Sequence, residues 1–128
     1  MEVVRRLADA FNRGDRDAAL VGYAPEVEWH TTGRFADEGV YRGPGGVERL
    51  LGELDRDLDE LRLCISDIRA IGEDKVYAAT KFIGRGKRSK ARVEQQLWFV
   101  QTFSEGLIVR VDNYASRAQA LEAAGLSE

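Results

Sequence analysis

The second half of this chain is a series of strand-like segments divided by short turns, and this pattern limits the fold more than any other feature. Three or four long segments follow residue 60: LRLCISDIRAI, KVYAATKFIG, RVEQQLWFVQTF and LIVRVDNYA. They are separated by Gly72-Glu73-Asp74, by the basic stretch 84–92 and by Ser104-Glu105-Gly106. Because connections this short join antiparallel neighbours, the last two segments are predicted to form a hairpin.

The first part of the chain has helical periodicity instead. Apolar residues recur at helical spacing up to Phe11, and residues 12–15, NRGD, then offer a glycine stop and an aspartate cap for a second short helix. Pro25 is predicted to end that helix, because proline cannot continue the helical hydrogen bonds. The segment EVEWH, residues 26–30, alternates like a strand.

Two more helices are predicted further along. Gly43-Pro44 opens the longer one, since proline is favoured in a first helical turn. Its apolar stripe consists of Val47, Leu50, Leu51, Leu54, Leu58 and Leu61. The other covers residues 116–125, with Ser116 as its N-cap and Gly125 as its stop.

Helices first and strands later predict the α+β class, with the helices covering one face of a curved antiparallel sheet. The 128 residues contain no linker and no internal repeat. This length suits one hydrophobic core, so a single domain spanning residues 1–128 is expected.

The charge balance narrows the range of partners. The 19 basic and 22 acidic residues give a formal net charge of −3, which offers no general attraction for nucleic acid or anionic membranes. No apolar run approaches the ~20 residues of a membrane helix, and Met1 does not open a signal peptide, so a cytoplasmic protein is expected. Cys64 is the only cysteine and His30 the only histidine. No disulfide, metal site or cofactor is therefore expected.

Three stretches that span nearly the whole chain resemble one known superfamily. They are VRRLADAFNRGDRDAALVGYAPEVEWHTTG, YRGPGGVERLL and GLIVRVDNYASRAQALEAAGL. These stretches resemble the nuclear-transport-factor-2-like superfamily, in its SnoaL-like branch. The resemblance rests on four motifs: N-x-G-D between two helices, a strand ending in E-W, a Y-R-G turn and an A-L-x-A-x-G-L helix. The resemblance implies a cone-shaped sheet around the helices, a cavity on its concave face and, in many members, a homodimer through the convex face.

The resemblance does not choose an activity, because this scaffold hosts ketosteroid isomerases, polyketide cyclases, epoxide hydrolases, dehydratases and non-catalytic binding domains. Aligned through N-x-G-D, the isomerase tyrosine falls on Leu7 and its base on Trp29, or on His30 if the strand slips by one. Counted back from the last hairpin, the acid of that enzyme falls on Phe99. The oxyanion donors of that enzyme are therefore missing. Limonene-type epoxide hydrolases have a pocket aspartate where this chain has Asn113, which cannot accept a proton in its place.

Trp29 and His30 are alternatives for the side chain that faces the cavity. On a regular strand, Val27 and Trp29 share one face while Glu28 and His30 share the other. We predict that Trp29 faces the cavity and that His30 points away, pairing with Glu28 or a backbone carbonyl. A one-residue bulge would reverse this and make His30 a candidate base.

The sequence predicts a domain that binds a small, mostly apolar molecule, with its activity undetermined. The predicted ligand-binding residues are Leu7, Phe11, Trp29, Tyr41, Leu54, Phe99, Val111 and Asn113. The candidate catalytic residues are His30, Tyr41 and Asn113. Two alternatives stay open: an isomerase, cyclase or hydrolase acting on a polyketide- or steroid-like substrate with a non-standard acid/base set, and a non-catalytic dimeric accessory module.

A homodimer through the convex face is also expected from the residues, because an exposed apolar sheet face favours self-association. The late strands have apolar residues on both faces, with one set comprising Leu97, Phe99 and Phe103 and the other Trp98, Val100 and Ile108.

Two charged features are predicted to lie outside the cavity. Arg110 and Asp112 should form an outward pair, although a two-residue turn at Glu105-Gly106 would bring Asp112 opposite Phe99. The basic stretch RGKRSKAR, residues 85–92, is interpreted as a solvated hairpin tip, with a site for an acidic ligand or partner as its alternative.

Overall fold

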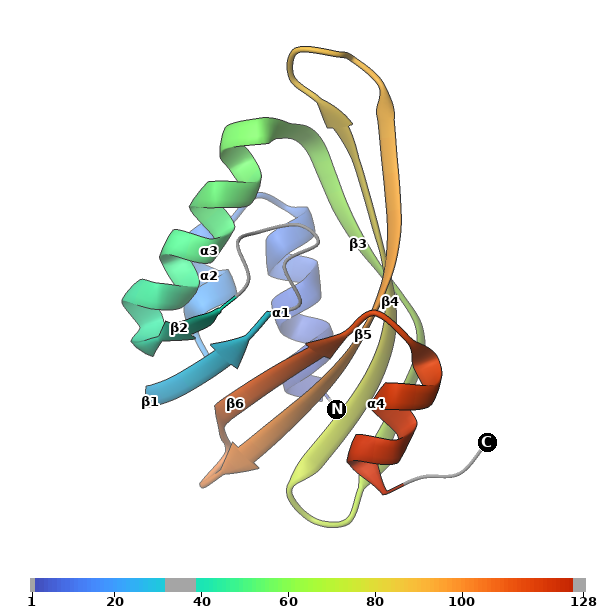
Figure 1. Ribbon diagram of the computed structural model, residues 1–128. Coiled ribbons are helices and arrows are strands. Elements are labelled where there is room, and N and C mark those ends of the chain that lie inside the picture. The colour runs from blue at the N-terminus through green and yellow to red at the C-terminus, as the bar shows by residue number, and fades with distance from the viewer. Residues whose placement is uncertain (1, 32–38, 126–128) are drawn as a thin grey trace.

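The computed structural model describes residues 2–31 and 39–125 (Figure 1). Within these ranges the elements are, in chain order, α1 (Glu2–Asn12), α2 (Arg16–Leu20), β1 (Tyr23–His30), β2 (Val40–Arg42), α3 (Gly43–Asp57), β3 (Leu58–Ile71), β4 (Lys75–Gly86), β5 (Arg92–Ser104), β6 (Leu107–Tyr114) and α4 (Arg117–Ala124). The predicted α+β class and the predicted β5–β6 hairpin are confirmed. Residues 1, 32 and 33 and Leu126, on which parts of the sequence interpretation rest, lie outside the described residues.

The first two helices form as predicted, but Pro25 does not end α2. Asp15 caps α2 by accepting a hydrogen bond from the Ala18 N–H at 3.1 Å. The helix ends at Leu20, and Pro25 lies inside β1. The pairing of β1 with β6 shifts register between Tyr23 and Glu28, so proline occupies a stretch where its missing N–H breaks no ladder bond.

Helix α3 starts at Gly43-Pro44 as predicted but stops before the end of its predicted apolar stripe. The backbone becomes extended at Leu58, whose N–H still bonds to the Leu54 carbonyl. Leu58 and Leu61 therefore belong to β3, where Leu61 packs against the core. Their helical spacing was misleading because a leucine a few residues beyond the end of a helix can reach the same core from a strand, as Leu61 does.

The sheet has the strand order β2-β1-β6-β5-β4-β3. Neighbouring strands are antiparallel except for β1 and β6, which are parallel. The fully antiparallel sheet of the sequence prediction is wrong at this one pair. A parallel pair needs a long crossover, and here almost the whole domain connects the two strands.

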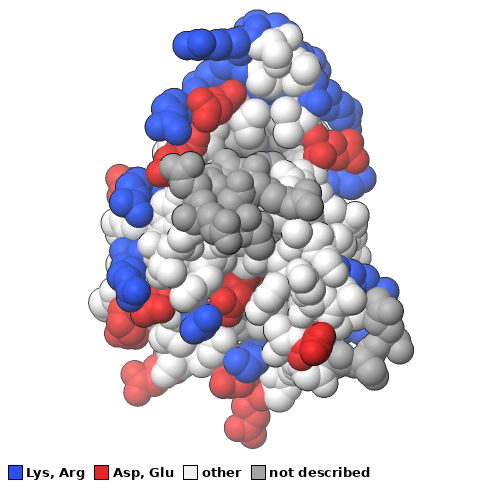
Figure 2. Space-filling view, in the orientation of Figure 1, with Lys and Arg blue, Asp and Glu red and all other residues white. Residues whose placement is uncertain are grey.

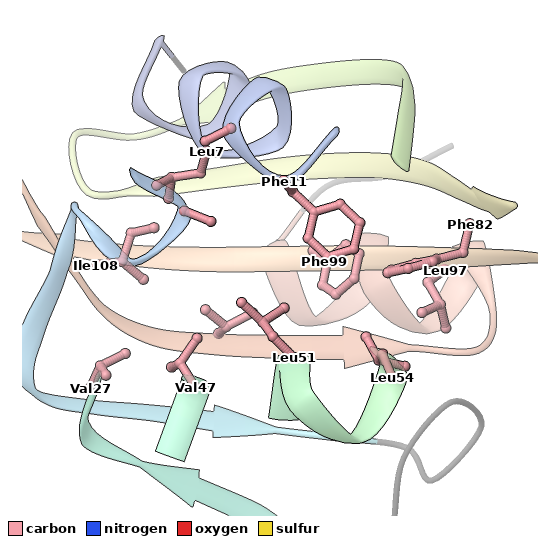
Figure 3. Packing of buried hydrophobic residues seen from close by; sticks show 13 residues of the cluster. Leu7, Phe11, Val27, Val47, Leu51, Leu54, Phe82, Leu97, Phe99 and Ile108 are labelled. Atoms are coloured by element: carbon pink, nitrogen blue, oxygen red, sulfur yellow. The ribbon is translucent and has the colours of Figure 1, made fainter. Parts of the chain in front are cut away.

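The helices lie on both faces of the sheet, not on one as predicted (Figure 1). Helices α1–α3 cover the concave face and build the main core with the inward residues of the strands (Figure 3). Helix α4 packs against β4, β5 and β6 from the other side, where Leu121 joins Tyr77 and Trp98 in a second cluster. Its predicted Ser116 cap and Gly125 stop are confirmed.

One inward residue was assigned to the wrong face. Ile108 belongs to the main core and is 1% exposed, whereas the sequence placed it outside with Trp98 and Val100. The register of β5 and β6 shifts between Thr102 and Phe103, which turns Ile108 inward opposite Phe103.

Candidate functional site: an apolar cavity on the concave face

A cavity of about 90 Å³ lies between the helices and the concave face of the sheet. Three polar side chains line it, Tyr23, Thr80 and Gln101. The rest of the lining is Val4, Leu7, Ala8, Phe11, Ala19, Trp29, Leu50, Leu51, Leu54, Leu63, Ile65, Ala78, Phe82 and Phe99. Helices α1 and α3 thus supply one wall, and strands β3, β4 and β5 supply the other.

Five of the predicted ligand-binding residues line the cavity, and three do not. Those inside are Leu7, Phe11, Trp29, Leu54 and Phe99. Tyr41, Val111 and Asn113 lie outside the described lining. Val111 is 1% exposed and packs within the main core.

The Tyr41 and Asn113 side chains make structural contacts instead. The Tyr41 hydroxyl donates to a carboxylate oxygen of Glu53 on α3 at 2.5 Å, and the Arg49 guanidinium lies 4.7 Å from the Tyr41 ring centre. These contacts hold β2 against α3. Asn113 Oδ1 accepts a hydrogen bond from Trp29 Nε1 at 3.0 Å, so it orients the indole from outside the cavity lining.

The predicted direction of Trp29 is confirmed. In the sheet, Trp29 pairs with Val111 of β6 and with Tyr41 of β2, without a bulge at this point. Its ring centre lies 6.2 Å from that of Tyr23 and 6.0 Å from that of Phe99, the latter in an edge-on arrangement. The three rings form an aromatic row along one side of the cavity.

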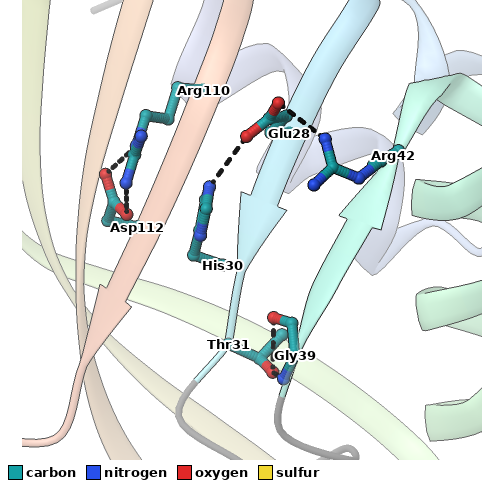
Figure 4. A network of polar contacts seen from close by, with 7 residues as sticks. All are labelled: Glu28, His30, Thr31, Gly39, Arg42, Arg110 and Asp112. Atoms are coloured by element: carbon teal, nitrogen blue, oxygen red, sulfur yellow. Dashed lines mark hydrogen bonds and ion pairs between the residues drawn. The ribbon is translucent and has the colours of Figure 1, made fainter.

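His30 points to the outer face of the sheet, as the alternation predicts (Figure 4). Its Nε2 lies 3.1 Å from Glu28 Oε1, and Arg42 donates to the other oxygen of Glu28 at 2.8 Å. The bonds from His30 and Arg42 lower the pKa of Glu28 below its usual value. His30 therefore belongs to a surface charge network and does not reach the cavity.

Asp112 lies on the same outer face. It faces Val100 of β5, while Asn113 faces Phe99. The two-residue turn at Glu105-Gly106 is present, because Ser104 pairs with Leu107, but the register shift between Thr102 and Phe103 keeps Asp112 on the outer face. Arg110 donates two hydrogen bonds to the Asp112 carboxylate, at 2.8 and 3.1 Å (Figure 4). The predicted outward pair is confirmed.

The sequence interpretation missed the polar side chains of the cavity. Thr80 donates to the Leu97 carbonyl at 3.0 Å, whereas Gln101 Oε1 is buried with no hydrogen-bond partner within residues 2–31 and 39–125. Gln101 could have been found, because it lies two residues after Phe99 on the same strand face. Tyr23 was placed on the second helix, but it starts β1, and burial raises the pKa of its hydroxyl.

Comparison with known proteins places the chain in a family. Residues 4–111 match the SnoaL-like domain. This chain belongs to the SnoaL-like domain family. An uncharacterized protein of Mycobacterium tuberculosis is 28% identical over 123 residues, covering 95% of this chain and 92% of the relative. A protein of Mycobacterium bovis matches to the same extent.

Solved structures share the fold of this SnoaL-like domain. An NTF2-like protein of unknown function from Burkholderia pseudomallei superposes with a TM-score of 0.80 at 20% identity, over 95% of this chain and 94% of that one. A protein with a ketosteroid isomerase-like fold from Catenulispora acidiphila, in complex with trimethylamine, gives 0.79 at 16% identity, over 98% and 94%. TerC, co-crystallized with polyporic acid, gives 0.78 at 20% identity, over 97% and 96%. The predicted family fold is thereby confirmed.

Tyr23 is the one titratable side chain in the described lining of the cavity of this SnoaL-like domain. No Asp, Glu, His, Lys, Arg or Cys side chain is among the residues that line it. The described ranges contain no cluster of three or more His, Cys, Asp or Glu side chains suited to a metal ion. None of the described helices is long and apolar enough to span a bilayer. The described lining of the cavity is therefore uncharged at neutral pH.

The basic stretch 85–92 forms the tip of the β4–β5 hairpin, away from the cavity. Figure 2 shows Lys and Arg gathered at this end of the molecule. Several of the charges are paired with nearby acids: Arg85 Nε lies 3.2 Å from Glu60, and Lys87 Nζ lies 3.8 Å from Asp59. This pairing agrees with the interpretation as a solvated hairpin tip.

Proposed function

We propose that this SnoaL-like domain binds a small, mostly apolar molecule in the cavity on its concave face. The observation that carries the proposal is an apolar lining that includes Gln101, whose Oε1 is buried without a hydrogen-bond partner in the described chain. Buried polar atoms in folded proteins are nearly always paired, so an unpaired one in a cavity indicates a place for a ligand or water. The co-crystallized small molecules of two structural neighbours support the same use of the scaffold.

The cavity volume limits the size of that molecule. A cavity of ~150 Å³ lined by leucine and phenylalanine binds benzene, and the cavity here is about 90 Å³. A one-ring ligand therefore needs side chains to move. Leu50, Leu51 and Leu54, all on α3, line the cavity together, so α3 contributes three of the side chains that border a ligand.

Filling the cavity tests this proposal. Ala78 is 1% exposed and lines the cavity, so Ala78→Leu places three more carbon atoms in it. We expect one-ring fragments such as toluene to change the fluorescence of Trp29 in the Trp98→Phe background, and Ala78→Leu to weaken this binding at least ~100-fold, as loss of the site requires. The matched control is Ala118→Leu at an exposed position of α4, which should bind normally. Equal binding by both variants would contradict the proposed site.

Ketosteroid isomerase activity is expected to be negligible. By resemblance, the tyrosine, base and acid positions of that enzyme are occupied here by Leu7, Trp29 and Phe99. All three line the cavity, and none has a side chain that can act as a proton acceptor. Binding without differential stabilisation of the transition state does not accelerate a reaction. The measurement is the growth of conjugated-enone absorbance from a β,γ-unsaturated ketosteroid. Turnover near the ~10 per second of ordinary enzymes would instead support the alternative of an isomerase, cyclase or hydrolase with a non-standard acid/base set.

Self-association through the outer face of the sheet is a further part of the proposal. Helix α4 covers Tyr77 and packs on Trp98, so these apolar residues of the outer face are not free to form a dimer interface. The part of this face that could pair with a second copy is mainly polar. The remaining outer face offers both signs of charge, in the Arg42–Glu28–His30 network and the Arg110–Asp112 pair, and a two-fold interface requires a self-complementary surface. Light scattering in moderate salt should give about twice the chain mass of 14.3 kDa. A monomer at micromolar concentration would exclude the dimeric module.

A further inference from the structure

We propose that Gln101 makes the cavity selective for small apolar molecules that carry a hydroxyl group, such as a simple alcohol or phenol. This inference rests on the proposed binding function and names the ligand class of that site. It follows from the position of the Gln101 amide and from the chemistry of the lining around it.

The neighbours of Gln101 in the sheet cannot satisfy its amide. Gln101 on β5 pairs with Val76 of β4 on one side and Val111 of β6 on the other. These valines are 4% and 1% exposed, so apolar side chains flank the amide on both sides. No hydrogen bond joins the Gln101 side chain to any residue in the described ranges, and its Oε1 is buried. An unpaired buried amide oxygen destabilises a fold, and a donor on a ligand bound in the cavity that Gln101 lines would satisfy it.

The class of ligand follows from the groups that an amide can pair with. An amide has a carbonyl oxygen that accepts and an NH₂ group that donates. A hydroxyl can donate to the oxygen and accept from the NH₂ group, whereas an ether or ketone can only accept and leaves the oxygen unpaired. A carboxylate or ammonium group is disfavoured, because the described lining holds no opposite charge to offset its desolvation.

Tyr23 offers a second polar contact in the same lining. Its ring lies against Trp29, and its hydroxyl makes no hydrogen bond with another described residue. A tyrosine hydroxyl is neutral at physiological pH and can donate to an oxygen of the ligand, and burial raises the pKa of Tyr23 further. The cavity thus combines the Gln101 amide and the Tyr23 hydroxyl with a lining that is otherwise apolar except for Thr80, whose hydroxyl donates to the Leu97 carbonyl.

Phenol and toluene form a matched probe pair, because they differ by a hydroxyl in place of a methyl group. Each is titrated into wild type, Gln101→Met and Gln96→Met, with Trp29 fluorescence in the Trp98→Phe background as the readout. Gln96 is an exposed residue of the same strand and serves as the control. We expect the ratio of phenol affinity to toluene affinity to fall about tenfold in Gln101→Met and to stay constant in Gln96→Met.

A second measurement needs no ligand. Gln101→Met removes a buried unpaired oxygen at nearly constant side-chain length, so the ligand-free melting temperature should rise by about 3 °C. An unchanged or lower melting temperature would show that the oxygen is already satisfied, and it would overturn the proposal. If Gln101→Met does not fold, Gln101→Leu replaces it in both measurements.

The outcomes separate this inference from the proposed function. If phenol and toluene both bind and Gln101→Met leaves their affinity ratio unchanged, selection by Gln101 is wrong while the binding function stands. If neither probe binds wild type at millimolar concentration, the binding function and the selectivity are both wrong.

Discussion

Replacing Trp29 with alanine is expected to lower the free energy of unfolding by about 3 kcal/mol. The substitution removes the contacts with the Tyr23 and Phe99 rings and the hydrogen bond to Asn113. The loss should lie at the lower end of the range for tryptophan-to-alanine changes, because the indole is half-buried and borders an existing cavity. Urea denaturation followed by circular dichroism measures the change.

His30→Ala is the control for this experiment, one position along the same strand. His30 contacts Glu28 on the outer face, and its side chain is 29% exposed. Surface substitutions of this kind cost less than ~1 kcal/mol. If His30→Ala were the more destabilising change, or if it abolished ligand binding, the inward direction of Trp29 would be wrong.

Asn12→Ala is expected to lower the free energy of unfolding by about 2–3 kcal/mol. The Asn12 amide bonds to both backbone groups of Leu63: its Nδ2 donates to the carbonyl at 2.9 Å, and its Oδ1 accepts from the N–H at 2.7 Å. Strand β3 is an edge of the sheet, so Leu63 has no strand on that side to replace these bonds. Thermal and urea unfolding should both report the loss.

The neighbouring exposed residue provides the comparison. Arg13→Ala changes an exposed side chain at the same turn, so it should change stability by less than ~0.5 kcal/mol. Equal effects of Asn12→Ala and Arg13→Ala would show that the Asn12 bonds contribute nothing net. A larger loss in Asn12→Ala would assign the Asn of the N-x-G-D motif the task of docking α1 on β3.

Sequence reasoning succeeded where the deciding interactions are local. The caps at Asp15 and Ser116 and the stop at Gly125 each involve groups within a few residues of one another. The inward direction of Trp29 follows from the two-residue period of a strand, which is also local. The cavity residues on α1 and α3 follow in the same way from helical spacing.

The errors arose where a distant partner decides the outcome. Leu58 continues a helical pattern but belongs to β3, because pairing with Gly86 on β4 outweighs the local spacing. Ile108 turns inward because a register shift with β5 reverses its face. Pro25 lies in a strand because the backbone there needs no ladder bond. None of these partners can be read from a short window of sequence.

The sequence by itself determined the α+β class, the order of the helices and of every strand except β2, and the apolar character of the concave face, because these depend on periodicity, turns and caps. Only the tertiary structure decided that α4 covers the opposite face of the sheet. It also decided that Asn113 accepts a hydrogen bond from Trp29, which lies 84 positions away in the sequence. It also decided that Gln101 faces the cavity between two valines with no protein partner in the described chain. Whether two side chains from distant strands form a hydrogen bond depends on how far apart the fold places their atoms. Local sequence propensities contain no information about that distance.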